Sequence, residues 1–456
     1  MREADAMPAA SALAAARARI GGAVESAVAT LEAMVAIDTS FPPGRGYDAF
    51  ADLIEALVSP LGFACERVVV PEALWRVAGG PASGRRTNLV ATRRSGKPVC
   101  GLYFHVDTVP PAPGWEEDPF RLRRDGDRLV GLGAADMKGA IAAVLLALRA
   151  ASEHGVALAY DPMLLLCTDE EGGLYPGVRH LAEQGRLEGH VLNFNGSAEA
   201  RIWAGCFGLF NLLVTVRGET AHAGEGNRAG AGVNAIEAAL PLLQGLAALK
   251  PIIARRVSAL PPPPHATGPL AGQLGIAAIH GGQCGGQVPA LLEITLNRRY
   301  APEERFEEAL AEIEAVIAGA RALAPGVTIE TALIGHLIPT EDPGGPHWPR
   351  WQAAMGEGFG YAPDEFRRWG ATSCSDFGYV QKTGMREVLL GGLGRPNRNV
   401  HGPGEHTTLG DVASLARSVL AYLAADFRSD LIPRSDLISR SDLPHADPPH
   451  SHPPRS

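Results

Sequence analysis

Three short and almost uninterrupted runs of apolar residues most constrain the fold of this chain. They are CGLYFHVD at 100–107, PMLLLCTDE at 162–170 and GHVLNFN at 189–195. Strands of this kind are buried on both faces, which is typical of the parallel sheets of α/β proteins. Helical patterns separate them, including the long helix indicated by MKGAIAAVLLALRAASEHG at 137–155. We therefore predict an α/β domain with a mixed, mostly parallel central sheet.

The pattern changes after residue 208. LFNLLVTVRG at 209–218 alternates like a half-exposed strand, and the segments that follow it read βαββαβ, the order of a ferredoxin-like unit. We predict that this inserted domain spans 209–336 and divides the α/β domain into 1–208 and 337–427. The last segment, 428–456, repeats RSDL and is then rich in Pro and His, so we expect a disordered tail.

Composition excludes several classes of protein. The formal net charge is −9 with no basic run, which argues against a nucleic-acid-binding surface. No apolar stretch approaches the roughly 18 residues needed to cross a bilayer, and the N-terminus lacks a secretory signal. The six cysteines are scattered without a CxxC pair. We expect reduced thiols, no membrane association and a cytoplasmic location.

Histidines and carboxylates follow the predicted strands. His105 and Asp107 are two residues apart, so in an extended chain they point the same way. Asp136 lies in a glycine-rich loop before a helix, Glu171 follows the next strand in TDEEGG, and His401 lies in NVHGPGEHT. Each of these side chains is common in proteins when taken alone. Ligands of open α/β sheets, however, bind at the carboxyl ends of the strands, where these side chains are predicted to lie. Together these side chains predict a divalent metal site of the Zn, Mn or Co type.

The motifs HVDTVP, GAADMKG, TDEEGG, GETAHAG, GVNAIEA and HGPGEH occur in this order. This set resembles the aminoacylase/carboxypeptidase-type family of zinc metallohydrolases, which includes acetylornithine deacetylase, succinyl-diaminopimelate desuccinylase and glutamate carboxypeptidase. The resemblance covers roughly residues 20–427. It implies a zinc-peptidase-like α/β domain interrupted by a ferredoxin-like lid, and a homodimer formed through that lid.

The resemblance also implies how the metal ligands are arranged. His105 binds one metal ion, and Asp107 orients that histidine. Asp136 bridges two ions, and Glu171 and His401 bind the second one. Ions held in this way activate water for hydrolysis.

Further roles follow from the same resemblance. Glu170 is the general base that takes a proton from the activated water. His222, in TAHAG on the lid, stabilises the oxyanion, often from the partner subunit. Arg298 or Arg299, in LNRRYAP, binds a substrate carboxylate, a task that suits the two parallel N–H groups of arginine.

One ligand position departs from the family pattern. The family has a glutamate or aspartate at the end of the strand before the lid, whereas VLNFNGSAEARIWAG places Asn195 there, or Asn193 if the register shifts. An amide oxygen is a weaker ligand for zinc than a carboxylate. We therefore predict one tightly bound ion with Asn195 among its ligands, and a second ion remains an alternative.

These residues lead to three hypotheses about function. The first is a hydrolase that cleaves an amide of a small carboxylate-bearing substrate, as an N-acyl amino acid deacylase or carboxypeptidase-like enzyme. The second is hydrolytic deamination of an aromatic amino acid such as 5-nitroanthranilate, on whose ring Trp115 and Trp203 could stack. The third is a non-catalytic metal- or partner-binding relative that lost one metal. In the first two, Thr372 and Ser373 of GATSCSDF line the substrate pocket.

Overall fold

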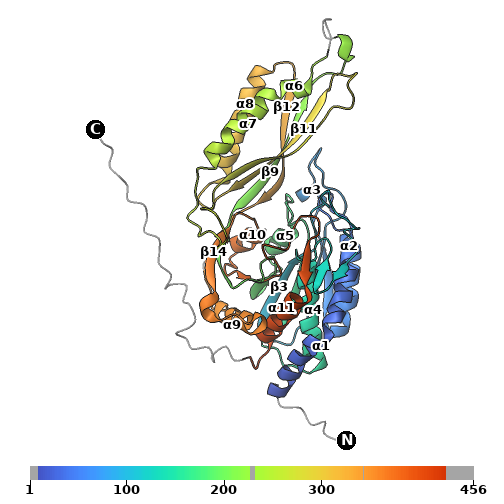
Figure 1. Ribbon diagram of the computed structural model, residues 1–456, viewed down its shortest axis with the longest axis vertical. Coiled ribbons are helices and arrows are strands. Elements are labelled where there is room, and N and C mark those ends of the chain that lie inside the picture. Colours follow the sequence, from blue (N-terminus) through green and yellow to red (C-terminus); the bar gives the residue numbers. More distant parts are fainter. Residues whose placement is uncertain (1–8, 226–231, 343, 428–456) are drawn as a thin grey trace, which may run out of the picture.

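The computed structural model describes residues 9–225, 232–342 and 344–427. Figure 1 shows an α/β part and, above it, a lid built on its own sheet. The segment 428–456, for which we predict disorder, lies outside the described residues.

The central sheet has six strands in the order β1-β2-β6-β3-β7-β15. The pairs β6–β3, β3–β7 and β7–β15 are parallel, while β1 and β2 form an antiparallel edge. This arrangement confirms the predicted mixed, mostly parallel sheet. The strands are β1 (Ala64–Val69), β2 (Thr87–Thr92), β3 (Val99–His105), β6 (Asp161–Cys167), β7 (His190–Asn193) and β15 (Leu389–Leu390).

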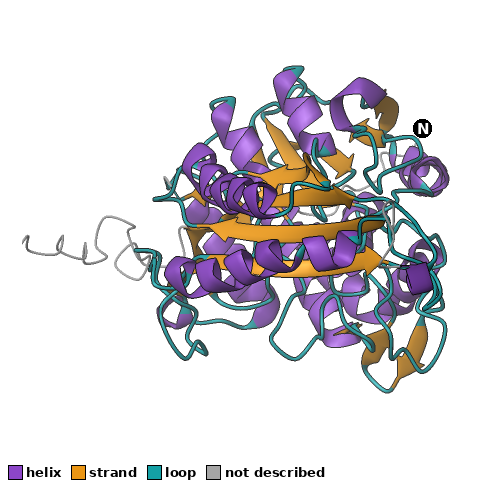
Figure 2. Ribbon diagram, turned by 90° about the horizontal axis from the view of Figure 1, so that it is seen from above, coloured by secondary structure: helices purple, strands orange, loops and turns teal. Residues whose placement is uncertain are grey.

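Helices pack on both faces of this sheet, because alternate residues of each buried strand point to opposite sides. Figure 2 shows the molecule from the lid end, with the lid towards the viewer. Leu102 and Phe104 of β3 join the core formed with α1, α4 and α11, whereas Tyr103 joins the core formed with α5 and α10. The helices of this domain are α1 (Ala9–Val35), α2 (Tyr47–Val58), α3 (Glu72–Trp75), α4 (Lys138–Glu153), α5 (Gly177–Glu183), α9 (Trp348–Phe359), α10 (Phe377–Lys382) and α11 (Leu409–Leu423).

The lid is a four-stranded antiparallel sheet in the order β10-β11-β9-β12. Its chain order is βαββαβ, which confirms the predicted ferredoxin-like unit. Ile294 and Leu296 pack with Leu246 and Ile313 of the helices in a core of its own. The elements are β9 (Gly208–Arg217), α6 (Ala235–Ala238), α7 (Leu240–Ile253), β10 (Gln273–Gly281), β11 (Leu291–Tyr300), α8 (Phe306–Leu323) and β12 (Thr328–Leu337).

One lid segment has the length and apolar character of a membrane span, contrary to the expectation that no stretch approaches that length. Residues Ala235–Ile253 have a mean hydropathy of 1.4 over 19 residues. The segment forms α6 and α7, and Leu242, Leu246 and Ile253 are buried in the lid core. These three side chains serve lid packing, whereas Leu240 and Ile252 of the same segment are exposed.

Two three-stranded sheets are separate from the central sheet and the lid sheet. One has the order β13-β8-β14 and lies beside the start of the lid, and the other has the order β16-β5-β4. Their strands are β4 (Arg123–Asp125), β5 (Arg128–Val130), β8 (Arg201–Cys206), β13 (Thr340–Glu341), β14 (Arg367–Ala371) and β16 (His406–Thr408).

Candidate active site

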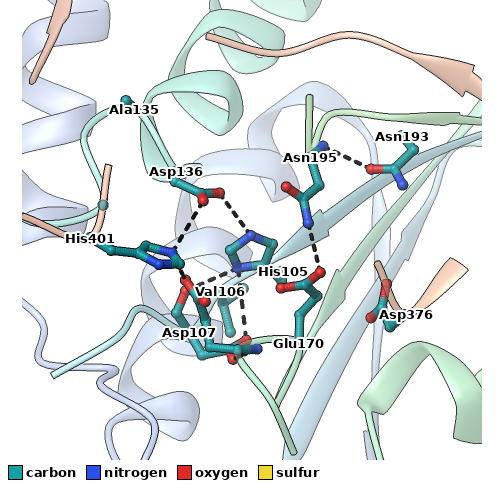
Figure 3. A network of polar contacts seen from close by, with 12 residues as sticks. His105, Val106, Asp107, Ala135, Asp136, Glu170, Asn193, Asn195, Asp376 and His401 are labelled. Atoms are coloured by element: carbon teal, nitrogen blue, oxygen red, sulfur yellow. Dashed lines mark hydrogen bonds and ion pairs between the residues drawn. The ribbon is translucent and has the colours of Figure 1, made fainter. Parts of the chain in front are cut away.

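The predicted metal ligands meet at the carboxyl ends of the central strands (Figure 3). His105 is the last residue of β3, and it pairs in parallel register with Cys167 at the end of β6. Glu171 therefore follows at the same edge as His105. The loop between β5 and α4 supplies Asp136, and the loop before β16 supplies His401. Residues far apart in sequence thus reach one place because parallel strands end together.

Asp136 lies between the two histidines. Its Oδ1 is 3.0 Å from His105 Nε2, and its Oδ2 is 3.6 Å from His401 Nε2. His401 Nε2 is also 3.0 Å from Glu171 Oε1. One ligand atom from each of His105, Asp136 and Glu171 lies within 4.8 Å of the others. An imidazole nitrogen and carboxylate oxygens at this spacing suit a hydrolytic divalent ion.

Asp107 fixes the orientation of His105. His105 Nδ1 lies 3.0 Å from the main-chain oxygen of Asp107, which can only accept a hydrogen bond, so the proton is on Nδ1. The Asp107 carboxylate is farther away, with Oδ1 at 3.9 Å from Nδ1. Its Oδ2 accepts a hydrogen bond from the main-chain N–H of Glu171 at 2.9 Å. His105 therefore keeps its Nε2 lone pair for a metal, and Asp107 ties the strand end to Glu171.

Glu405 holds the loop that carries Asp136, a role that we did not predict. Its carboxylate accepts hydrogen bonds from the main-chain N–H groups of Gly133, Ala135 and Asp136, each at 3.0 Å. Glu405 is 1% exposed, so these bonds are made away from water. The glutamate was visible in the sequence between His401 and His406, but nothing local indicated its distant partners.

The electrostatics of the site favour a bound cation. Burial by itself would lower the pKa of His105, but its hydrogen bond to Asp136 and the surrounding carboxylates raise that pKa well above its usual value. Burial raises the pKa of Glu170 well above its usual range, and it raises the pKa of Asp107 and of Glu405 to about 7. Acids gathered in a buried place resist ionisation unless positive charge compensates them. A divalent ion supplies that charge.

Asn195 has a different neighbour from the one we predicted. Its Nδ2 donates a hydrogen bond to Glu170 Oε1 at 2.8 Å, and its main-chain N–H donates to Asn193 Oδ1 at 2.7 Å (Figure 3). The side chain thus presents its amide nitrogen, which cannot ligate a cation, to Glu170. This geometry links Asn195 to the predicted general base through Nδ2. Its Oδ1 is the atom that could bind a metal ion, so Asn195 as a ligand stays a prediction.

The two arginines that we predict to bind a substrate carboxylate, Arg298 and Arg299, lie in different surroundings. Arg299 lines the cavity beside the metal residues, and its Nη1 donates to the main-chain oxygen of Thr372 at 2.9 Å. Arg298 is fully buried within the lid and forms an ion pair with Glu304. Ser373 lines the cavity, whereas Thr372 holds Arg299 through its main chain. Arg299 is therefore the arginine of this pair that a substrate can reach.

His222 does not reach the cavity of its own chain. It is exposed, it lies five residues beyond the end of β9, and its Nδ1 accepts a hydrogen bond from the main-chain N–H of Gly224 at 3.1 Å. Only the other end of β9, which begins at Gly208, adjoins the α/β part. A role for His222 therefore requires a second chain.

The cavity has a volume of about 520 Å³ and extends from the metal residues to the lid strands β9 and β11. A volume of this order holds a small molecule. Trp203 lines it, whereas Trp115 lines a separate hollow with Arg121 and Arg128. The other side chains that bear on its chemistry are Asp136, Glu170, Glu171, Asn195, Arg201, Asn211, Asn297, Arg299, Ser373 and His401.

An α/β domain with histidine and carboxylate ligands at its strand ends, a buried glutamate beside them and a ferredoxin-like lid defines a metal-dependent hydrolase of C–N bonds. The chain belongs to peptidase family M20/M25/M40, which matches residues 101–425. These findings confirm the predicted family, fold and enzyme class.

Similar proteins agree with this assignment. The succinyl-diaminopimelate desuccinylase of Xanthomonas campestris pv. campestris (strain B100) is 31% identical over 383 residues, which is 80% of this chain and 89% of that protein. Human carnosine dipeptidase 1 has a similar fold, with a TM-score of 0.73 and 16% identity over 90% of this chain and 98% of that one. The di-peptidase Dug1p of Saccharomyces cerevisiae gives a TM-score of 0.74 and 16% identity over 90% and 97% of the two chains.

Proposed function

We propose that this enzyme hydrolyses the amide bond of a small, carboxylate-bearing N-acyl amino acid or dipeptide-like substrate. The observation that carries the proposal is the position of Glu170, which lines the cavity next to the cluster of His105, Asp136 and Glu171. The desuccinylase and dipeptidase names of the relatives support an amide as the bond that is cleaved.

The metal would be held by His105, Asp136, Glu171 and His401. A divalent ion at this place lowers the pKa of a coordinated water toward neutrality and polarises the carbonyl of the amide. We propose a single tightly held Zn, Mn or Co ion, supported by the one cluster of this kind found in the described ranges. A Bacillus subtilis protein of similar fold is a dinuclear metal binding peptidase, so two ions are the alternative.

Glu170 moves the proton in this proposal. Its side chain is 6% exposed, and burial together with the charges of Asp376 and other acids raises its pKa. The positive charge of a divalent ion in the adjacent cluster would offset this effect and keep Glu170 as the carboxylate that can accept a proton. It takes a proton from the attacking water and delivers it to the departing nitrogen. Asn195, which donates to Glu170 Oε1, keeps that oxygen in place and leaves Oε2 for the proton.

Arg299 binds a carboxylate of the substrate from the lid side of the cavity, with Ser373 nearby and with Thr372 steadying the guanidinium. His222 enters from the lid of a partner subunit and stabilises the oxyanion, so the active species is a homodimer. We place the enzyme in the cytoplasm, in keeping with its six free cysteines.

A second candidate is hydrolytic deamination of an aromatic amino acid such as 5-nitroanthranilate. It is favoured by Trp203, an aromatic residue that lines the cavity. Glu170 would play the same part here, since a proton must again reach the departing nitrogen. Family membership and the intact cluster disfavour the non-catalytic alternative.

The test combines metal analysis with two substrate panels. Dialysed protein is assayed for metal per chain and for activity on N-acyl amino acids and on amino-substituted benzoates. We expect about one ion per chain and release of the free amino acid from the acyl panel. Ammonia release from the benzoates alone would replace this proposal with the deaminase, and no turnover on either panel would refute both.

A further inference from the structure

A second arginine, Arg201, lines the cavity and has no part in the function proposed above. Arg201 is the first residue of β8 and lines the cavity together with Trp203. Because residues two apart on a strand share a face, Arg201 and Trp203 point to the same side of β8. Strand β14 runs parallel to β8 and pairs Trp369 with Trp203 in register.

The two tryptophans hold the guanidinium of Arg201. Its Cζ lies 4.6 Å from the ring centre of Trp203 and 5.3 Å from that of Trp369. Its Nε and Nη2 both donate to the main-chain oxygen of Trp369, at 3.3 and 3.2 Å. A guanidinium packed against aromatic rings and fixed on one edge is oriented before any ligand arrives.

In the ranges that the structure describes, Arg201 forms no ion pair with an acid, although Glu199 is near enough to favour its charged form. Within the described part of the chain, no carboxylate lies within 4 Å of its nitrogens, and Nη1 has no hydrogen-bond acceptor. The indole N–H of Trp203 likewise has no acceptor among the described residues. Burial lowers the pKa of Arg201 to about 10, which leaves it charged at neutral pH. An unpaired cation in a buried place is costly, so an anion that pairs with it gains affinity.

We infer that Arg201 is a specificity-determining residue that binds a second acidic group of the substrate, while Arg299 binds the first. The preferred substrates are then N-acyl amino acids with two carboxylates. The inference rests on the proposed function for the reaction, but it concerns binding and can be tested without turnover. Both arginines line one cavity, whose volume of about 520 Å³ accommodates such a dianion.

The test uses matched substrates that differ by one carboxylate. The pairs are N-succinyl-L-alanine with N-butyryl-L-alanine, and N-acetyl-L-glutamate with N-acetyl-L-norvaline. For at least one pair, the wild-type kcat/KM ratio should favour the dianion, and Arg201→Gln should lower that ratio by about 10- to 100-fold. Arg201→Lys should retain an intermediate ratio. A loss of folded enzyme lowers both kcat/KM values by the same factor, so their ratio reports specificity alone.

The matched control is Arg367→Gln. Arg367 lies opposite Arg201 on the neighbouring strand β14, but it is exposed and does not line the cavity. This variant should leave both ratios unchanged. Binding of succinate and butyrate, measured by calorimetry, provides a readout that needs no chemistry. Weaker succinate binding in Arg201→Gln supports the inference even if no amide is cleaved. Unchanged ratios for both pairs and unchanged succinate binding would overturn it.

Discussion

Asn195 donates a hydrogen bond from its Nδ2 to Oε1 of Glu170 at 2.8 Å. The residue at the expected third-ligand position therefore contacts the proposed general base, and the cluster of His105, Asp136 and Glu171 forms without it. A carboxylate in place of this amide would repel Glu170 unless a cation lay between them. The amide thus fits a site that holds one ion and positions its base by a hydrogen bond.

Replacing Asn195 with alanine should slow the reaction without removing the metal. A hydrogen bond to a charged group contributes about 1.5–3 kcal/mol, so kcat should fall about 10- to 100-fold. Metal content per chain after dialysis should equal that of the wild type. A loss of metal in Asn195→Ala would show instead that Asn195 is a ligand.

Replacing Glu405 with glutamine should loosen the loop that carries Asp136. Three main-chain N–H groups donate to this carboxylate, and an amide can accept on only one side. The free energy of unfolding should fall by about 1–3 kcal/mol, and metal should dissociate more readily during dialysis against a chelator. Glu341→Gln, at an exposed position of β13, should change neither quantity. Wild-type metal retention in Glu405→Gln would contradict this role.

The buried ion pair of Arg86 and Asp169 should stabilise the turn that presents Glu170 and Glu171. Arg86 Nε lies 2.8 Å from Asp169 Oδ2, both side chains are at most 1% exposed, and Tyr47 donates to Asp169 Oδ1 at 2.9 Å. Arg86→Met leaves a buried carboxylate unpaired and should cost about 3–5 kcal/mol of unfolding free energy.

Urea denaturation measures this cost, and the double variant Arg86→Met with Asp169→Asn provides the control. It should recover part of the loss, because the uncompensated charge is removed. A double variant that is as unstable as the sum of both single variants would mean that the pair contributes nothing as a pair.

Two histidines remote from the metal cluster should make stability fall in acid. Burial lowers the pKa of His190 and of His336 to about 4, and each ring faces a tyrosine hydroxyl, Tyr422 at 2.6 Å and Tyr300 at 3.0 Å. In the unfolded chain, the pKa of a histidine is about 6.5. Below that pH the unfolded chain therefore binds protons that the folded chain does not bind. Stability is therefore full above about pH 6.5 and declines as the pH falls toward about 4, at up to roughly 1.4 kcal/mol per pH unit for each histidine.

Urea midpoints at pH 7.5, 6.0 and 5.0 should show this decline. His190→Gln cannot be protonated, so its stability should depend less steeply on pH over the same interval. An identical pH dependence in this variant and in the wild type would exclude His190 as a source of the effect.

The sequence was sufficient to predict the fold and the meeting of His105, Asp136 and Glu171 in one cluster, because both follow from the pattern of buried strands. The apolar runs at β3 and β6 specify buried strands, and parallel strands bring His105 and Glu171 to one edge. The orientation of Asn195 could not be predicted, because position along a strand end does not say which atom of an amide faces which neighbour. Glu405 and Arg201 act on residues brought near only by the tertiary fold, so no spacing in the sequence indicated their contacts.

The most direct test of the account is the activity and metal content of Glu170→Gln, beside Glu314→Gln, at an exposed position of α8, as a control outside the cavity lining. Glutamine keeps the shape of the side chain but cannot take a proton from water. The account predicts that Glu170→Gln retains its metal and loses roughly 100- to 10,000-fold in kcat, while the control keeps wild-type activity. Metal-replete Glu170→Gln with wild-type kcat would contradict the assignment of Glu170 as the general base.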